Sequence, residues 1–226
     1  FLLKPFGTNP KFVLLGFLSV IAIFSMFMSN TATAAMMLAF LAPILNKAFK
    51  EGDKGKIGLA LSIPVAANIG GIGTTIGTPP NGTAVSNLEQ VGEIITFGDW
   101  AIHMVPFVII MILFSWFVLQ KLFPFSTEKL EVNIPPSDKP KTWRTTLVWW
   151  TFAITILLWA TESITHISSN IVALIPLGVF VCTGTFTKDD IKEIDWSVLW
   201  LVAGGFALGY AMLDISKGGT GLGATL

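Results

Sequence analysis

Charged residues are scarce in this chain. Asp, Glu, Lys and Arg make up 12% of the 226 residues, whereas they make up about a quarter of an ordinary globular domain. The fourteen basic and fourteen acidic residues cancel, so no basic surface favours a nucleic acid as partner. Because 53% of the residues are hydrophobic and the charges are confined to short segments between apolar runs, the composition predicts a membrane protein.

Cysteine and histidine are also nearly absent. The single cysteine, Cys182, excludes a disulfide within the chain, and it lies in an apolar run typical of inert packing. Two histidines, His103 and His166, make a poor set of metal ligands. The sequence contains no His-Glu-x-x-His motif, and nothing else in it indicates an enzyme. No cleavable signal peptide is recognisable, and since the first residue is Phe1 we expect a piece of a longer chain.

Apolar runs close to the length that crosses a bilayer dominate the sequence instead. We therefore predict an all-α polytopic membrane protein, in which every span satisfies its own backbone hydrogen bonds. The first part, residues 1–123, is expected to hold a re-entrant hairpin over 12–46, a broken helix over 57–92 and a span over 101–122. A linker over 124–145 follows, and the last part, residues 146–226, is expected to hold spans over 146–160, 170–184 and 196–213.

The basic residues give the expected orientation. All of them except Lys217 lie in segments that the positive-inside rule assigns to the cytoplasmic side. Residues 89–100 and 161–169 contain no Lys or Arg and are expected outside. We therefore expect a multi-pass protein of the cytoplasmic (inner) membrane, with the long loop 121–145 in the cytoplasm.

Three small polar residues, Ser29, Asn30 and Thr31, interrupt the uncharged run 12–46 near its middle. Both ends of this run are expected in the cytoplasm, so the run has to enter the membrane and return. Each limb of about 17 residues would measure roughly 25 Å as a helix. Non-helical backbone at that depth persists only where protein buries it or where it lines a water-filled cavity.

A second irregular run, residues 57–88, contains a cluster of glycines and prolines between Gly70 and Gly82. A continuous helix does not tolerate such a cluster. We expect a half-helix from about Ile57 to Asn68, an unwound loop, and a second half-helix that begins near Pro79 or Pro80. A re-entrant hairpin together with a discontinuous span is typical of secondary transporters that bind their substrate near the bilayer midplane.

The two interruptions offer opposite kinds of ligand. Helix N-termini near Thr31 and Pro79 present unpaired N–H groups and the positive end of the helix dipole, which attract anions. Carbonyls of the preceding half-helices, with the Ser29 hydroxyl and the Asn30 amide oxygen, are suited to a hard cation such as sodium. Neither loop contains Arg or Lys, so neutral donors, dipoles and bound cations would hold the anion.

Two motifs together resemble a known family. MSNTATAAMM at Met28–Met37 and IGTPPN at Ile76–Asn81 are similar to the signature pair of the divalent anion/sodium symporters, in particular their bacterial INDY-type sodium/dicarboxylate carriers. WSVLWLVAGGFALG at Trp196–Gly209 resembles the start of that family's second repeat. The resemblance covers nearly the whole chain. It implies a homodimeric inverted-repeat transporter that works by rigid-body alternating access.

The resemblance also implies roles for single residues. The substrate-binding residues would be Asn30, Thr31, Thr78 and Pro79. One sodium ion, the coupling ion, would be held by Ser25, Ser29, Asn30 and Gly77. The family's second hairpin and second Pro-Pro loop have no counterpart in this chain, so we expect it to hold half of the complete site.

The expected function is sodium-coupled symport of a C4-dicarboxylate such as succinate. A sodium-independent dicarboxylate exchanger, or a carrier of citrate or another divalent anion on the same fold, remain open alternatives. An intramembrane enzyme with Ser29 as nucleophile belongs to a different class, and it would need a general base near Ser29 that neither histidine is predicted to supply. A channel is a further alternative, although a clamp that closes round its ligand favours a carrier.

Overall fold

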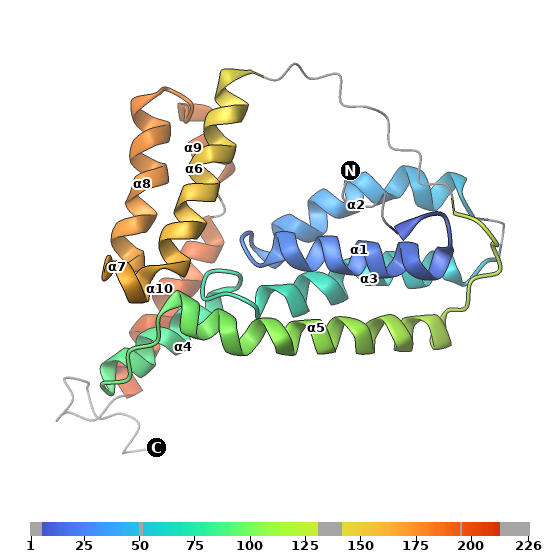
Figure 1. Cartoon of the computed structure of the whole chain (residues 1–226), viewed down its shortest axis with the longest axis horizontal. Helices are drawn as coiled ribbons and strands as arrows, with labels where there is room; N and C mark the ends of the chain where they lie inside the picture. Colours follow the sequence, from blue (N-terminus) through green and yellow to red (C-terminus); the bar gives the residue numbers. More distant parts are fainter. Residues whose placement is uncertain (1–5, 50–51, 131–141, 195, 213–226) are drawn as a thin grey trace. The chain divides into compact units, whose positions relative to one another are not determined.

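The computed structural model describes residues 6–49, 52–130, 142–194 and 196–212, and over these ranges the chain forms helices and no strands (Figure 1). This agrees with the predicted all-α class. Lys4, Lys50, Lys139, Lys141, Lys217 and the centre of the expected linker lie outside the described residues. The helices are α1 (Pro10–Ser25), α2 (Asn30–Lys47), α3 (Gly55–Gly71), α4 (Pro79–Gln90), α5 (Phe97–Leu122), α6 (Trp143–Ala160), α7 (Glu162–Thr165), α8 (Ser169–Cys182), α9 (Lys188–Glu193) and α10 (Trp196–Met212).

The chain divides into two compact units. One comprises Phe1–Asn81 and Ala101–Pro135, and the other comprises Gly82–Trp100 and Pro136–Leu226. The domain boundaries expected from the sequence stay a prediction, since they refer to repeats of a transporter and not to compactness.

The core of the first unit forms where α1 packs against α2 and α3 (Figure 1). Leu14, Phe17, Leu18 and Ile21 recur three or four residues apart on α1, so they share one face, and each is at most 1% exposed. Side chains of α2, α3 and α5 complete the same apolar cluster, among them Leu41, Leu59, Ile63, Ala66, Val108 and Ile112. Because α1 and α3 share this core, it holds the two helices against each other.

The first predicted interruption separates α1 from α2. Helix α1 ends at Ser25, and α2 begins at Asn30 with Ser29 as its N-cap. The Ser29 hydroxyl accepts a hydrogen bond from the Ala32 N–H at 3.2 Å, as expected for serine at this position. That this hairpin re-enters a membrane stays a prediction.

The second predicted interruption separates α3 from α4. Helix α4 begins at Pro79, as expected, because proline has no N–H to leave unpaired in the first turn. Helix α3, however, continues past Asn68 to Gly71. The helix thus ends a few residues after the expected Asn68, within the predicted cluster. Flexible glycine backbone does not explain its end, because none of Gly70, Gly71, Gly73 and Gly77 has a positive φ.

Close packing explains these glycines instead. A Cβ on Gly70 would lie 2.5 Å from the Cα atom of Ala22 and 2.3 Å from its carbonyl oxygen. Such a distance is far shorter than any real contact, so only glycine allows α3 to approach α1 this closely. Small residues serve the same purpose between helices in membranes.

The second unit contains α6 and α8, which pack against each other. Thr151 and Thr155 are buried on α6, and the Thr155 hydroxyl donates to the Thr151 carbonyl at 2.8 Å. The short helices α7 and α9 lie between the expected spans, in segments for which the sequence predicts no helix. A capping box between Thr187 and Asp190 begins α9, which is a local signal that could have been recognised.

Helix α5 is the one helix of the described part that is both long and apolar enough to cross a membrane, with 26 residues from Phe97 to Leu122. Shorter apolar helical segments are found at Pro10–Ser25, Asn30–Ala42, Asn170–Cys182 and Leu199–Met212. Helices α6, α8 and α10 coincide closely with the expected spans 146–160, 170–184 and 196–213. That these three cross the membrane stays a prediction.

Candidate functional site

The two helix interruptions of the first unit meet at Ser25, the last residue of α1. The fully buried Ser25 hydroxyl lies 2.9 Å from the amide oxygen of Asn30 and 2.7 Å from the carbonyl oxygen of Ala67. A serine hydroxyl has one proton to donate. Three oxygens therefore share one proton here, so this group of atoms has more hydrogen-bond acceptors than donors.

Asn30 links the start of α2 to the end of α3. Its amide nitrogen donates to the side-chain oxygen of Asn68 at 3.1 Å, while its amide oxygen faces Ser25. A Cβ on Gly71 would lie 2.3 Å from that amide oxygen. The side chain of Asn30 is therefore fixed between α1 and α3, and Gly71 provides the room that it occupies.

The loop between α3 and α4 is held from both sides. The Asn81 amide nitrogen donates to the carbonyls of Gly71 at 2.9 Å and Thr74 at 2.8 Å. The Thr74 hydroxyl donates to the Met26 carbonyl just beyond the end of α1. Both Asn81 and Thr74 are buried, so these bonds fix the loop against the first interruption.

Gly77 lies where this loop passes the end of α1. A Cβ on Gly77 would lie 2.5 Å from the carbonyl oxygen of Gly71 and 3.0 Å from that of Ser25. The backbone of Gly77 thus adjoins two further oxygens. The Ser25 hydroxyl, the Asn30 amide oxygen and the Ala67 carbonyl, which share one proton, define what we call the oxygen cluster.

The structure brings together some of the predicted site residues and separates others. Of the four predicted sodium ligands, Ser25 and Asn30 belong to the oxygen cluster, and Gly77 lies next to the Ser25 carbonyl. Ser29 serves as the N-cap of α2. Of the predicted substrate-binding residues, Thr31 is exposed on the first turn of α2. Thr78 and Pro79 are half-buried at the start of α4.

Three further polar residues escaped the sequence analysis as members of the site. Asn68, Thr74 and Asn81 connect the two interruptions through side-chain hydrogen bonds. The signal that indicates these residues is a polar side chain within a charge-free run. Burying an unpaired amide in an apolar environment is costly, so such a side chain is expected to have a hydrogen-bond partner. Their partners lie up to 48 residues away in the sequence, so the pairing itself was not predictable.

A buried hydroxyl without a partner lies close by in sequence, in the first turn of α2. Thr33 is fully buried, and its Oγ1 atom has no hydrogen-bond partner in the structure. Buried polar groups nearly always have a protein, water or ion partner. The Thr33 hydroxyl is an exception to this rule within the described part of the chain.

The oxygen cluster carries no formal charge. Across the described ranges, no group of three or more His, Cys, Asp or Glu side chains could hold a metal ion. Sites for divalent cations usually include carboxylates, whereas hydroxyl, amide and carbonyl oxygens alone are hard but neutral ligands. This donor set fits a monovalent hard cation such as sodium.

A buried carboxylate, that of Asp53, lies away from this site, in the loop between α2 and α3. It accepts hydrogen bonds from the Thr127 hydroxyl at 2.6 Å, the Gly55 N–H at 2.8 Å, the Thr127 N–H at 2.9 Å and the Ser126 N–H at 3.2 Å. Burial alone raises the pKa of Asp53, but these four donors outweigh it and lower the pKa below 3.8. Asp53 thus ties the start of α3 to the segment that follows α5.

Comparisons with known proteins agree with this architecture. The sequence profile of the citrate transporter family, CitMHS, matches residues 1–224. The chain is 33% identical over 209 residues to the low-affinity phosphate transporter PHO90 of Saccharomyces cerevisiae. This alignment covers 91% of this chain and 23% of that protein. The chain is 27% identical over 242 residues to the sodium-dependent dicarboxylate transporter SdcS of Staphylococcus saprophyticus, covering 92% of this chain and 46% of that protein.

A transporter of Haemophilus influenzae with no described substrate is 33% identical over 214 residues, which cover 86% of this chain and 44% of that protein. The chain thus spans less than half the length of each of these relatives. They are named as transporters, which agrees with the absence of an enzyme signature in the sequence. Since the family profile extends over almost all of its residues, the chain belongs to the citrate transporter family, CitMHS.

Proposed function

We propose that the full-length protein is a secondary transporter that carries a C4-dicarboxylate, such as succinate, across the cytoplasmic membrane together with sodium. The observation that carries the proposal is the oxygen cluster, in which Ser25, Asn30 and Ala67 place three oxygens around one proton. The likeness to sodium-dependent dicarboxylate transporters supports it. Rigid-body alternating access, an INDY-type homodimer and the inner membrane are parts of the same proposal.

Sodium would be held by the side-chain oxygens of Ser25 and Asn30 and by backbone carbonyls near Gly77. A bound ion would become the partner of the Asn30 and Ala67 oxygens in place of the Ser25 hydroxyl proton. The Ser25 hydroxyl would keep its proton, turn it away from the ion and offer a lone pair, which a rotatable hydroxyl allows. Ser29 would contribute its hydroxyl oxygen while it continues to cap α2.

The dicarboxylate would bind at the adjacent helix starts. Asn30 and Thr31 lie in the first turn of α2, and Thr78 precedes the first turn of α4 at Pro79. Amides and hydroxyls at helix N-termini stabilise a carboxylate through hydrogen bonds and the helix dipole. A sodium ion beside Asn30 would add a full positive charge, so cation and anion would stabilise each other.

The test is uptake of radiolabelled succinate into liposomes that contain the full-length protein, with and without an inward sodium gradient. We expect the wild type to accumulate succinate only with the gradient, and Asn30→Ala to lose uptake by about tenfold or more, since it removes a polar partner of the buried Ser25 hydroxyl, worth a few kcal/mol. Asn170→Ala is the matched control, because Asn170 is exposed on α8. Unchanged uptake by Asn30→Ala would refute the site assignment.

The same assay separates the alternatives. Uptake that requires internal dicarboxylate and ignores sodium would identify an exchanger. Labelled citrate in place of succinate tests the substrate named by the family profile.

Divalent phosphate is a second candidate substrate. Two yeast phosphate transporters, PHO90 and PHO87, are 33% and 32% identical to this chain. Phosphate needs the same kind of neutral donors and helix N-termini as a carboxylate. Labelled phosphate uptake that unlabelled succinate does not reduce would favour phosphate over the dicarboxylate.

A further inference from the structure

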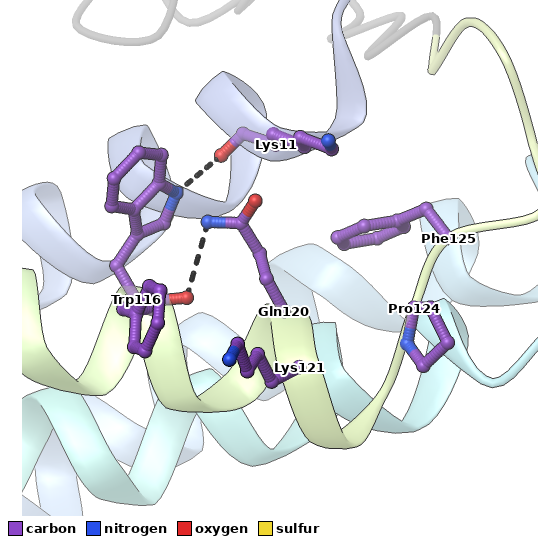
Figure 2. Close-up of a pocket in the computed structure, with 7 residues that line it drawn as sticks. Lys11, Trp116, Gln120, Lys121, Pro124 and Phe125 are labelled. Carbon is purple, nitrogen blue, oxygen red and sulfur yellow. Dashed lines mark hydrogen bonds between the residues drawn. The ribbon is translucent and has the colours of Figure 1, made fainter.

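A pocket of about 390 Å³ lies in the first unit, away from the two helix interruptions (Figure 2). It forms where the first turn of α1 meets the last two turns of α5 and the segment after α5. Figure 2 shows Lys11 of α1 and Lys121 of α5 on opposite sides of the pocket, with Gln120 between them. The complete lining is Lys11, Trp116, Phe117, Gln120, Lys121, Pro124 and Phe125.

Both charged side chains that line this pocket are positive. Its lining contains two lysines and no Asp or Glu. Within the described part of the chain, neither ammonium group takes part in a salt bridge. Two unneutralised cations in one pocket attract an anion, and the attraction is stronger next to apolar material than in bulk water.

The backbone around the two lysines is held in place. The Trp116 indole N–H donates to the Lys11 carbonyl at 2.7 Å, and the Gln120 amide donates to the Trp116 carbonyl at 3.2 Å. The Phe12 and Trp116 rings stack at 6.4 Å, and the Lys121 ammonium lies 5.0 Å from the centre of the Phe117 ring. Tryptophan and lysine at the end of a spanning helix are typical of the membrane–water boundary.

An exposed apolar stripe continues from the pocket along α5. Phe117, Phe114, Ile110 and Phe107 follow one another at intervals of three or four residues, so they share one face of the helix. Their exposed fractions are 54%, 60%, 64% and 45%. The stripe lies on the helix that is long and apolar enough to cross a membrane, so it can contact acyl chains.

We propose that this pocket binds the headgroup of an anionic phospholipid, whose acyl chains lie along the stripe on α5. The ammonium groups of Lys11 and Lys121 point apart in Figure 2, and their flexible side chains would turn toward a phosphate bound between them. The Gln120 amide has a second N–H for a further polar contact, beside the one that it donates to Trp116. A free phosphate ion would use the two lysines, but it would leave the aromatic lining and the stripe without a partner. Lipid binding in this pocket does not depend on which substrate the protein transports.

The test is native mass spectrometry of the full-length protein with phosphatidylglycerol and phosphatidylcholine of identical acyl chains. We expect phosphatidylglycerol to bind roughly tenfold to thirtyfold more tightly, the contribution of two lysines at a membrane surface. The double variant Lys11→Gln/Lys121→Gln should lose this preference. Lys54→Gln/Lys56→Gln, which removes the same charge from the same unit outside the pocket, should keep it within about twofold.

Three results would overturn the proposal. The wild type could bind both lipids equally, or the control variant could lose the preference as fully as the pocket variant, which would indicate unspecific surface charge. Displacement of phosphatidylglycerol by an equal concentration of inorganic phosphate would show that the headgroup alone is the ligand.

A second measurement leaves both lysines unchanged. Phosphatidylglycerol with brominated acyl chains should quench tryptophan fluorescence of the wild type. The quenched part should include the emission of Trp116, which the Trp116→Phe variant lacks. Brominated phosphatidylcholine should quench this part less at the same concentration. Equal quenching by the two lipids would contradict binding in the pocket even if the lysine variants failed to fold.

Discussion

At the scale of single residues, the oxygen cluster depends on one missing side chain. Gly71 carries no Cβ, and the amide oxygen of Asn30 occupies the space where a Cβ would be. Polar groups alone therefore do not define the site, because its geometry also requires a residue without a Cβ at position 71. The sequence predicts Gly71 as part of a helix-breaking cluster, whereas in the structure it is a helical residue in close contact with Asn30.

A substitution of Gly71 by alanine should therefore displace Asn30. We expect Gly71→Ala to destabilise the full-length protein by about 1–3 kcal/mol, as overpacking does, and to weaken sodium-dependent uptake. Gly178→Ala is the matched control, since a Cβ on Gly178 meets nothing within 4 Å and alanine is the better helix former. Thermal unfolding in detergent and sodium titration of uptake measure the two effects, and equal behaviour of both variants would contradict the role of Gly71.

At the scale of helices, the sequence predicts helix starts correctly where a residue and its near neighbours determine them. Ser29 caps α2 and Pro79 begins α4, and both are properties of a residue and its near neighbours. The expected end of α3 near Asn68 comes too early. The helix accommodates Gly70 and Gly71 because α3 packs closely against α1 and Asn30 there, and the sequence gives no local signal of this packing. Bonds between distant segments, such as Thr74 with Met26, have no local signal at all.

The Asp53 carboxylate connects two such segments and should make stability depend on pH. Its pKa in the folded protein lies below the ordinary value of 3.8, so its stabilising effect is complete above that value and is lost as the pH falls through the lower, folded-state pKa. We expect Asp53→Asn to lower the free energy of unfolding by about 1–3 kcal/mol at neutral pH. The difference from the wild type should shrink at pH values below 3.8.

Thermal unfolding at neutral and acidic pH measures this effect. Glu128→Gln is a suitable control, because Glu128 is exposed in the same segment after α5 and the substitution changes the net charge equally. A difference between Asp53→Asn and the wild type that persists unchanged in acid would show that the carboxylate charge is not the cause.

At the scale of the whole molecule, orientation in the membrane rests on the distribution of Lys and Arg. The loop with Lys54 is expected in the cytoplasm, and the loop with Glu93 is expected outside. In a background without other cysteines, Glu93→Cys should react with an impermeant maleimide on intact cells, and Lys54→Cys should react only after permeabilisation. Both side chains are exposed, so the reverse pattern would invert the topology.

The hydrogen bonds that join the two helix interruptions have one more consequence. Ser25 contacts Ala67, Asn30 contacts Asn68, and Thr74 contacts Met26, so neither loop can rearrange without disturbing the other. An ion that orders one loop must then change the affinity of whatever binds the other loop, and thermodynamic linkage requires the reverse effect to be of equal size. Two ligands held by these loops would therefore form one cooperative unit, with each acting as the other's effector.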